Sequence, residues 1–222
     1  MFYKNFLKDY KDWCSLTINE QIVYSKLLNN TLLELGGESW GNDKNRDMEY
    51  IYDCIDIDDG YIEFEMPKYS ILSKQTNISY RSLTGKEGII SSLIDKGVIR
   101  DNDGNFELYV EKELIKGGYF NLFIESELKE KQLVFFTFLC ERLRFFNKRQ
   151  YEITKNTKWL RNKALDTYAS RLANDFGTTK KSVQKLMERL QEKYYIKRAD
   201  SKKRFWVNVD LKNIDTKGNM EF

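Results

Sequence analysis

Polar and basic side chains recur on one face of a predicted helix near the C-terminus. Thr179, Lys180, Lys181, Gln184 and Lys185 fall opposite an apolar stripe with helical spacing. Lysine ammonium groups can pair with phosphate oxygens, while Gln and Thr side chains can hydrogen-bond to base edges. This pattern therefore predicts a surface that binds double-stranded DNA.

A second basic cluster follows this helix within a few residues. If about six cations of the two clusters neutralised phosphates, DNA binding would weaken steeply as salt rises. The slope of log affinity against log salt concentration would be on the order of −5. A solvated charged surface is the alternative interpretation of either cluster taken alone. The second cluster consists of Lys197, Arg198, Lys202, Lys203 and Arg204.

Two helices and a hairpin must position these side chains. Residues 168–176 have helical apolar spacing and end at Gly177, a natural helix stop. Thr178 or Thr179 can cap the next helix, which is expected from about Lys180 to Lys193. Strands are expected at 195–198 and 205–209, with a polar turn between them. Helix, turn, helix and hairpin is the order of a winged helix. The inward stripe of the second helix is Val183, Leu186, Met187 and Leu190.

The first half of the chain repeats this order. Each half is expected to begin with an apolar helix, at 17–28 and 130–139, followed by a strand at 61–66 and a weaker one at 151–153. In the first half a helix is expected at 70–75, and a capping box at 84–87 opens a third helix that ends at Gly97. Asp103-Gly104 marks the hairpin turn. The predicted fold class is therefore α+β, mainly α, with two winged-helix (helix-turn-helix plus β-hairpin) domains in tandem, at 1–118 and 119–222.

Charge divides between the two predicted domains. Residues 1–127 contain 14 Lys and Arg against 23 Asp and Glu, whereas residues 128–222 contain 23 against 11. The first hairpin turn, 101–104, is itself acidic and would repel phosphate. We therefore expect the basic domain to contact DNA. The acidic domain is expected either to pair with a protein partner or a second copy of the chain, or simply to support its neighbour.

Several chemistries are excluded by composition. The chain has no histidine, which removes Ser-His-Asp and Cys-His nucleophilic sites and His-containing zinc sites. Its three cysteines are far apart in sequence, and no phosphate-binding glycine motif is present. The acid-rich stretch 36–60 lacks the oxygen pattern of a calcium loop, so it is expected to be a solvated loop. No enzymatic activity, catalytic residue, metal or cofactor is expected.

No segment indicates a membrane. The longest apolar run, 133–140, is interrupted by Thr137 and is far shorter than the roughly 18 residues that a spanning helix needs. The N-terminus carries aromatic and acidic residues too early for a signal peptide. A cytoplasmic location is expected.

The stretch 155–166 and the aromatic residues near it allow two interpretations. Lys155, Lys158, Trp159, Arg161 and Lys163 could form an arm that extends the basic surface, or a plain connector. Aromatic side chains could stack on exposed bases, or they could fill the core under the hairpin. The core is favoured for Phe205 and Val207, and the other aromatic candidates are Tyr151, Trp159 and Trp206.

The string from Leu172 to Ile196 resembles the helix-turn-helix of bacterial winged-helix regulators and of plasmid or phage replication proteins. It departs from that pattern at Tyr194, where a glycine often follows the second helix. The resemblance implies a plasmid or phage replication initiator or accessory protein that binds DNA through its C-terminal domain and associates with itself or a partner through its N-terminal domain. A transcriptional regulator is the first alternative. A winged-helix protein–protein adaptor with no nucleic-acid role is the second.

Overall fold

The chain folds into two compact units, Met1–Asn121 and Leu122–Phe222, which we call unit 1 and unit 2. Each contains helices and a small three-stranded antiparallel sheet, so the predicted class of a mainly helical α+β protein with two winged-helix-like units is confirmed. The computed structural model describes residues 2–7, 15–36, 60–111, 114, 119–122, 124, 127–198 and 204–207.

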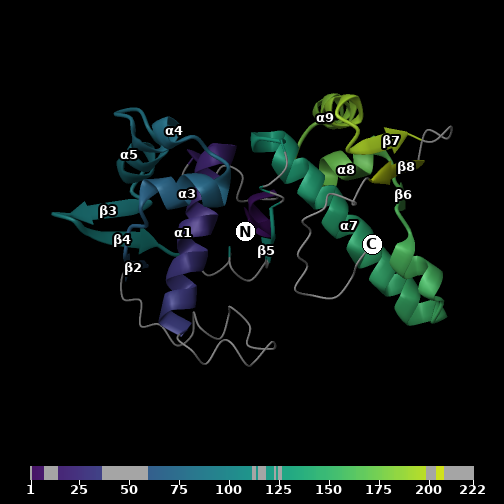
Figure 1. Ribbon diagram of the computed structural model, residues 1–222, viewed down its shortest axis with the longest axis horizontal. Helices are drawn as coiled ribbons and strands as arrows, with labels where there is room; N and C mark the ends of the chain where they lie inside the picture. The colour runs from purple at the N-terminus through teal and green to yellow at the C-terminus, as the bar shows by residue number, and fades with distance from the viewer. Residues whose placement is uncertain are drawn as a thin grey trace. The chain divides into compact units, whose positions relative to one another are not determined.

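Unit 2 contains the predicted helix-turn-helix and hairpin. Its sheet has the strand order β6-β8-β7. Figure 1 shows α8 and α9 beside the N-terminal half of α7, with the rest of α7 and η4 extending past them. The elements are α7 (Glu130–Thr154), η4 (Thr157–Arg161), β6 (Ala164–Asp166), α8 (Ala169–Asp175), α9 (Lys180–Glu192), β7 (Ile196–Arg198) and β8 (Arg204–Val207).

The core of unit 2 lies where α7, α8 and α9 meet the sheet. Phe135 and Phe176 pack edge to face, with ring centroids 4.9 Å apart. Phe205 and Val207 are buried under the hairpin, as predicted. Because strand side chains alternate, the residue between them, Trp206, faces outward.

The strand predicted at 151–153 is wrong. These residues form the last turn of α7, which is a single helix of 25 residues. Three alternating residues are too few to specify a strand, and the helical pattern runs through them without interruption. The strand that completes the sheet is β6, which pairs with β8 through Leu165 and Phe205.

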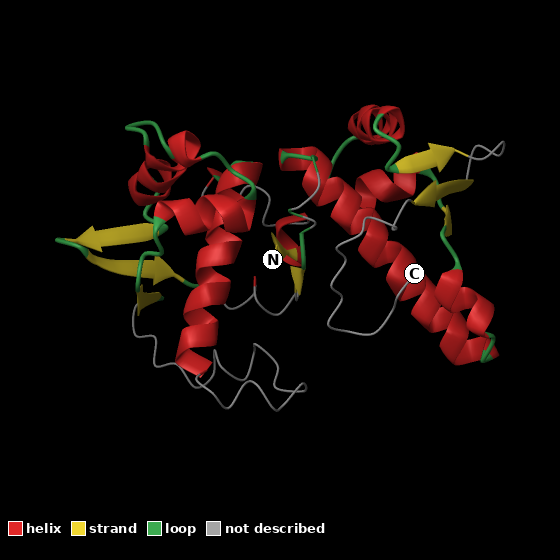
Figure 2. Cartoon of the chain, in the orientation of Figure 1, coloured by secondary structure: helices red, strands yellow, loops and turns green. Residues whose placement is uncertain are grey.

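The sheet of unit 1 has the strand order β2-β4-β3. Its last strand in sequence lies in the middle of the sheet, as β8 does in unit 2. Figure 2 shows β3 and β4 as a hairpin that projects from the helices of this unit. Its turn is Asp103-Gly104, and both residues have positive φ, as a tight two-residue hairpin requires. The elements are β1 (Phe2–Tyr3), η1 (Lys4–Leu7), α1 (Ile18–Gly36), β2 (Tyr61–Phe64), α3 (Tyr69–Thr76), α4 (Tyr80–Thr84), α5 (Ile89–Asp95), β3 (Ile99–Asn102), β4 (Asn105–Tyr109) and β5 (Tyr119–Phe120).

The capping box predicted at Thr84–Glu87 is wrong. Thr84 is the last residue of α4, and Gly88 occupies the N-cap position of α5. The same Thr-x-x-Glu pattern does form a capping box at the start of α1. There the Thr17 backbone N–H donates to Glu20 Oε2 at 2.5 Å, and the Glu20 N–H donates to Thr17 Oγ1 at 3.4 Å.

The membrane prediction concerns helix length and hydropathy. In the part of the chain that the structure describes, no helix combines the length and the apolar character needed to cross a bilayer.

The acid-rich loop expected at 36–60 falls almost wholly outside the described residues.

Candidate nucleic-acid interface

The helix α9 begins at a side-chain cap. Thr179 Oγ1 accepts a hydrogen bond from the Ser182 backbone N–H at 3.2 Å, so Thr179 rather than Thr178 is the cap. Gly177 precedes it with φ of +62° and ends α8. These two local signals set the turn between α8 and α9, and hence the direction in which α9 presents its side chains.

The outward face of α9 carries the predicted DNA-contacting residues. All four residues of the predicted apolar stripe are buried. Because that stripe is fixed against the core, the opposite face must point to solvent. The residues that are exposed there are Thr179, Lys180, Lys181, Gln184 and Lys185, together with Glu188.

The cations of α9 are not neutralised by neighbouring carboxylates. Among the described residues, no Asp or Glu oxygen lies within 4.0 Å of the side-chain nitrogens of Lys180, Lys181, Lys185 or Arg189. Lys180 and Lys181 occupy the first turn, and Lys185 lies one turn beyond Lys181. A polyanion approaching this face would therefore meet cations that need not first break an ion pair.

Sequence reasoning missed the start of α7 as part of this surface. A shallow pocket of about 160 Å³ separates α9 from the first turn of α7, and Lys129 and Lys131 line it opposite Lys185 and Arg189. Lys131 Nζ donates to Thr178 Oγ1 at 3.2 Å, which ties the start of α7 to the turn before α9. The run Lys129-Glu130-Lys131 in the sequence offered the charge, but only the packing brings it beside α9.

The hairpin does not present its basic residues on a single face. Lys197 is opposite Trp206 in the β7–β8 register, whereas Arg198 is opposite Phe205. Opposed residues of an antiparallel pair share a face, and successive residues alternate. Lys197 therefore lies on the outward face with Trp206, and Arg198 lies on the other side of the strand. Lys202 and Lys203 lie outside the described residues.

Arg204, another predicted phosphate contact, is engaged by a carboxylate. Its Nε and Nη2 donate to the two Asp166 oxygens at 2.8 and 2.7 Å, across the β6–β8 pair. The hydrogen bonds and charge of Asp166 raise the pKa of Arg204 above its ordinary value. Arg204 would have to release or share this partner to contact a phosphate.

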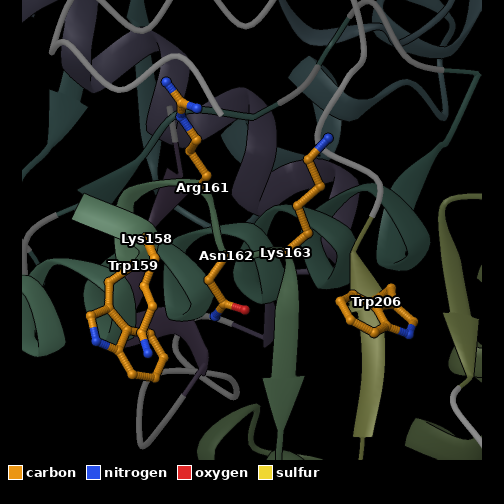
Figure 3. Close-up of a pocket in the computed structure, with 6 residues that line it drawn as sticks. All are labelled: Lys158, Trp159, Arg161, Asn162, Lys163 and Trp206. Atoms are coloured by element: carbon orange, nitrogen blue, oxygen red, sulfur yellow. The ribbon is translucent and has the colours of Figure 1, made fainter. Parts of the chain in front are cut away.

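A second basic groove lies where η4 leads into β6. It holds about 430 Å³ and is lined by Lys158, Trp159, Arg161, Asn162, Lys163 and Trp206. Figure 3 shows Trp159 and Trp206 on opposite sides of Asn162. The stretch 155–163 is thus a 3-10 helix and a connector whose aromatic and basic side chains meet the outward face of β8. The sequence contained these residues, but their meeting depends on the β6–β8 pairing.

Two cations near the end of α5 and in β3 of unit 1 are held by a carboxylate or an aromatic ring. Lys96 Nζ lies 2.8 Å from both oxygens of the buried Glu20, and Ser92 Oγ donates to the same carboxylate. Burial acts to raise the pKa of Glu20, but the hydrogen bonds from Lys96, Ser92 and Thr17 outweigh it and lower that pKa. Arg100 lies 3.4 Å from the Tyr61 ring centroid and pairs with Glu107.

Comparisons of the chain with protein-family models, curated proteins and solved structures found no match.

Proposed function

We propose that the protein binds double-stranded DNA through unit 2, with α9 lying in the major groove. The observation that carries this proposal is the exposed face of α9, whose cations have no carboxylate partner among the described residues. The 13-residue helix is about 20 Å long, and the overall helix diameter of about 10–12 Å matches the roughly 12 Å width of the major groove.

The side chains of this surface have different proposed roles. Lys180, Lys181 and Lys185 would contact phosphates, and Gln184 has the donor and acceptor needed to read an adenine edge. Thr179 lies at the helix N-terminus, where free backbone N–H groups and the helix dipole favour a phosphate. Lys129 and Lys131 of α7 would extend the phosphate contacts beside α9.

The β7–β8 hairpin would contribute less to the free energy of DNA binding than α9. Lys197 and Arg198 point to opposite sides of β7, so a single DNA strand would meet one of them more closely than the other. Arg204 would contribute only if Asp166 released it. We therefore assign most of the binding free energy to α9 and the start of α7.

We further propose a role in starting or assisting the replication of a plasmid or phage, with unit 1 used for self-association or a protein partner. The support is the resemblance of Leu172–Ile196 to replication proteins and the acidic character of unit 1, which disfavours DNA contact there. A transcriptional regulator would use the same surface of unit 2, and the arrangement of its DNA sites would differ.

The test is selection of bound sequences from random duplexes by the full chain, followed by a mobility shift of the enriched duplex. We expect a shift at micromolar protein or below in low salt, with weakening as salt rises. Repeated direct elements would support replication initiation, and a palindrome would support regulation. No enrichment and no shift would exclude DNA binding and leave the adaptor.

A further inference from the structure

The basic groove formed by η4, β6 and β8 is separate from the face of α9. Its residues are Lys158, Trp159, Arg161, Asn162, Lys163 and Trp206 (Figure 3). None of them belongs to α9 or to the pocket beside it. The groove combines three cations with two indole rings, and this combination differs from the lysine and glutamine surface of α9.

The base of the groove is held rigidly by paired asparagines. Asn147 is fully buried in α7, and its Nδ2 donates to the Asn162 carbonyl at 2.7 Å. Asn162 Nδ2 donates to Asn147 Oδ1 and to the Ala164 carbonyl, and its Oδ1 accepts from the Ala164 N–H. These bonds connect α7, η4 and β6, so the groove does not have to be ordered by a ligand.

The two indoles are positioned without being buried. Trp159 packs edge-on against Phe146 of α7, with centroids 5.7 Å apart. Trp206 is 44% exposed on the outward face of β8, beside Ala164 and Lys197 in the strand register. An exposed tryptophan contributes little to a core, but its flat face offers a platform on which a planar ring can stack.

The cations around these rings suit a phosphodiester chain. In the described part of the chain, no carboxylate oxygen lies within 4.0 Å of the charged nitrogens of Lys158 or Arg161. Lys158 Nζ lies 5.5 Å from the Trp159 ring centroid. A positive charge is therefore next to an aromatic face, as in surfaces that bind unpaired nucleotides.

We propose that this groove binds a short segment of single-stranded nucleic acid, with a base stacked on Trp206 and the backbone phosphates near Lys158 and Arg161. The base faces of duplex DNA are covered by neighbouring base pairs, so an indole can stack only on an unpaired base. The volume of about 430 Å³ lies in the range of pockets for small ligands, so it is suited to one or two nucleotides rather than to a duplex.

The experiment measures fluorescence anisotropy of a labelled oligothymidylate, about ten nucleotides long, titrated with the full chain. Trp206→Ala is expected to weaken binding at least about fivefold, and Trp206→Phe, which keeps an aromatic ring, should recover part of that loss. The matched control is Phe145→Ala, which removes an exposed aromatic of α7 that does not line the groove. Circular dichroism of each variant checks that the fold is retained.

Charge variants give a second, independent test. Lys158→Glu with Arg161→Glu should weaken oligothymidylate binding about tenfold or more. The matched control is Lys74→Glu with Lys86→Glu, which changes the net charge equally at exposed positions of unit 1. Lys181→Glu with Lys185→Glu should leave oligothymidylate binding within about twofold of wild type, because α9 does not line the groove.

Three results would overturn the inference. The first is no binding of oligothymidylate by the wild-type chain at about 10 µM protein in low salt. The second is equal weakening by Trp206→Ala and Phe145→Ala. The third is loss of oligothymidylate binding in the α9 double variant, since that would mean one shared surface. Failure of duplex binding alone would remove the proposed role of α9 and leave this groove unaffected.

Discussion

The second helix of each helix-turn-helix segment differs between the two units. Thr179 caps α9 through the Ser182 N–H, and Ser79 caps α4 in the same way through the Ser82 N–H. The helix in unit 2 then continues to Glu192, whereas the helix in unit 1 ends at Thr84 and resumes as α5 at Ile89.

The break in unit 1 has a specific backbone cause. The Gly88 N–H donates to the Gly85 carbonyl at 2.6 Å, which closes a tight turn between α4 and α5. A Cβ at Gly88 would lie 2.6–2.7 Å from backbone atoms of Gly85 and Leu83, so only glycine fits there. The turn at Gly85–Gly88 therefore divides the second helix of unit 1 into α4 and α5.

Two similar helix-turn-helix segments thus present different surfaces. In unit 2 a continuous helix carries cations with no carboxylate partner in the described residues. In unit 1 the helix is interrupted, Lys96 pairs with Glu20, and the hairpin turn is acidic. The same topology therefore presents an exposed basic helix in one copy and an interrupted helix with an acidic hairpin in the other.

The largest expected effect tests this contrast directly. Lys181→Glu with Lys185→Glu should weaken duplex DNA binding by about 100-fold or more, because two phosphate contacts become repulsions. The fold should survive, since both side chains are exposed and a glutamate in the first turn suits the helix dipole. A mobility shift measures the affinity. Lys74→Glu with Lys86→Glu in unit 1 is the control, and an equal loss there would remove the distinction between the units.

The second effect concerns the stability of unit 1. Lys96→Met should lower the free energy of unfolding by about 2 kcal/mol, because Glu20 would remain buried without its cation. Urea unfolding measures this change. Lys74→Met, at an exposed position without an ion pair to any described residue, is the control and should change stability little. If Lys96→Met lowers the free energy of unfolding as little as Lys74→Met does, the ion pair between Lys96 and Glu20 does not stabilise the protein.

The same pair predicts a pH dependence with a definite sign. The pKa of Glu20 is lower in the folded protein than its ordinary value of 4.5. Its contribution to stability is therefore complete above about pH 4.5 and is lost as the pH falls through the lower folded value. Urea unfolding between pH 3 and 6 should show this loss in the wild type, and Glu20→Gln should reduce it. A Glu20→Gln profile parallel to that of the wild type would contradict the assignment.

The third effect compares the two helix caps. Thr179→Ala should cost about 1 kcal/mol, because the Ser182 N–H loses its acceptor, and Ser79→Ala should cost a similar amount at α4. Only the Thr179 variant should also weaken duplex binding, because that cap begins α9, the helix proposed to enter the major groove of DNA. Urea unfolding and a mobility shift on both variants separate the two effects. Equal binding losses would argue that unit 1 also touches DNA.

The smallest effect tests the hairpin. Asp166→Asn should strengthen duplex binding about threefold, because Arg204 would no longer share its charge with a carboxylate. Asp95→Asn in unit 1 removes the same charge at an exposed position and is the control. If the two variants give the same small change, Arg204 does not contribute to the surface.

Much of this architecture can be predicted from local patterns. The apolar stripe of α9, the glycine that ends α8 and the Asp-Gly turn of the first hairpin are read from adjacent residues, and the structure contains all three. Tyr194 takes a positive φ of 62°, the left-handed conformation for which a glycine is usual at this position.

Only the tertiary structure decided which of two identical patterns forms a capping box. Thr17-x-x-Glu20 and Thr84-x-x-Glu87 match equally well in sequence, but Glu20 is held by Ser92 and Lys96, which lie more than 70 residues away in the chain. Likewise, Asp166 meets Arg204, and Trp206 reaches the groove of Trp159, through pairing of strands far apart in the chain. Helix periods and turns depend on neighbouring residues, so the sequence determined them. Ion pairs and grooves depend on contacts between distant segments, and those exist only once the chain has folded.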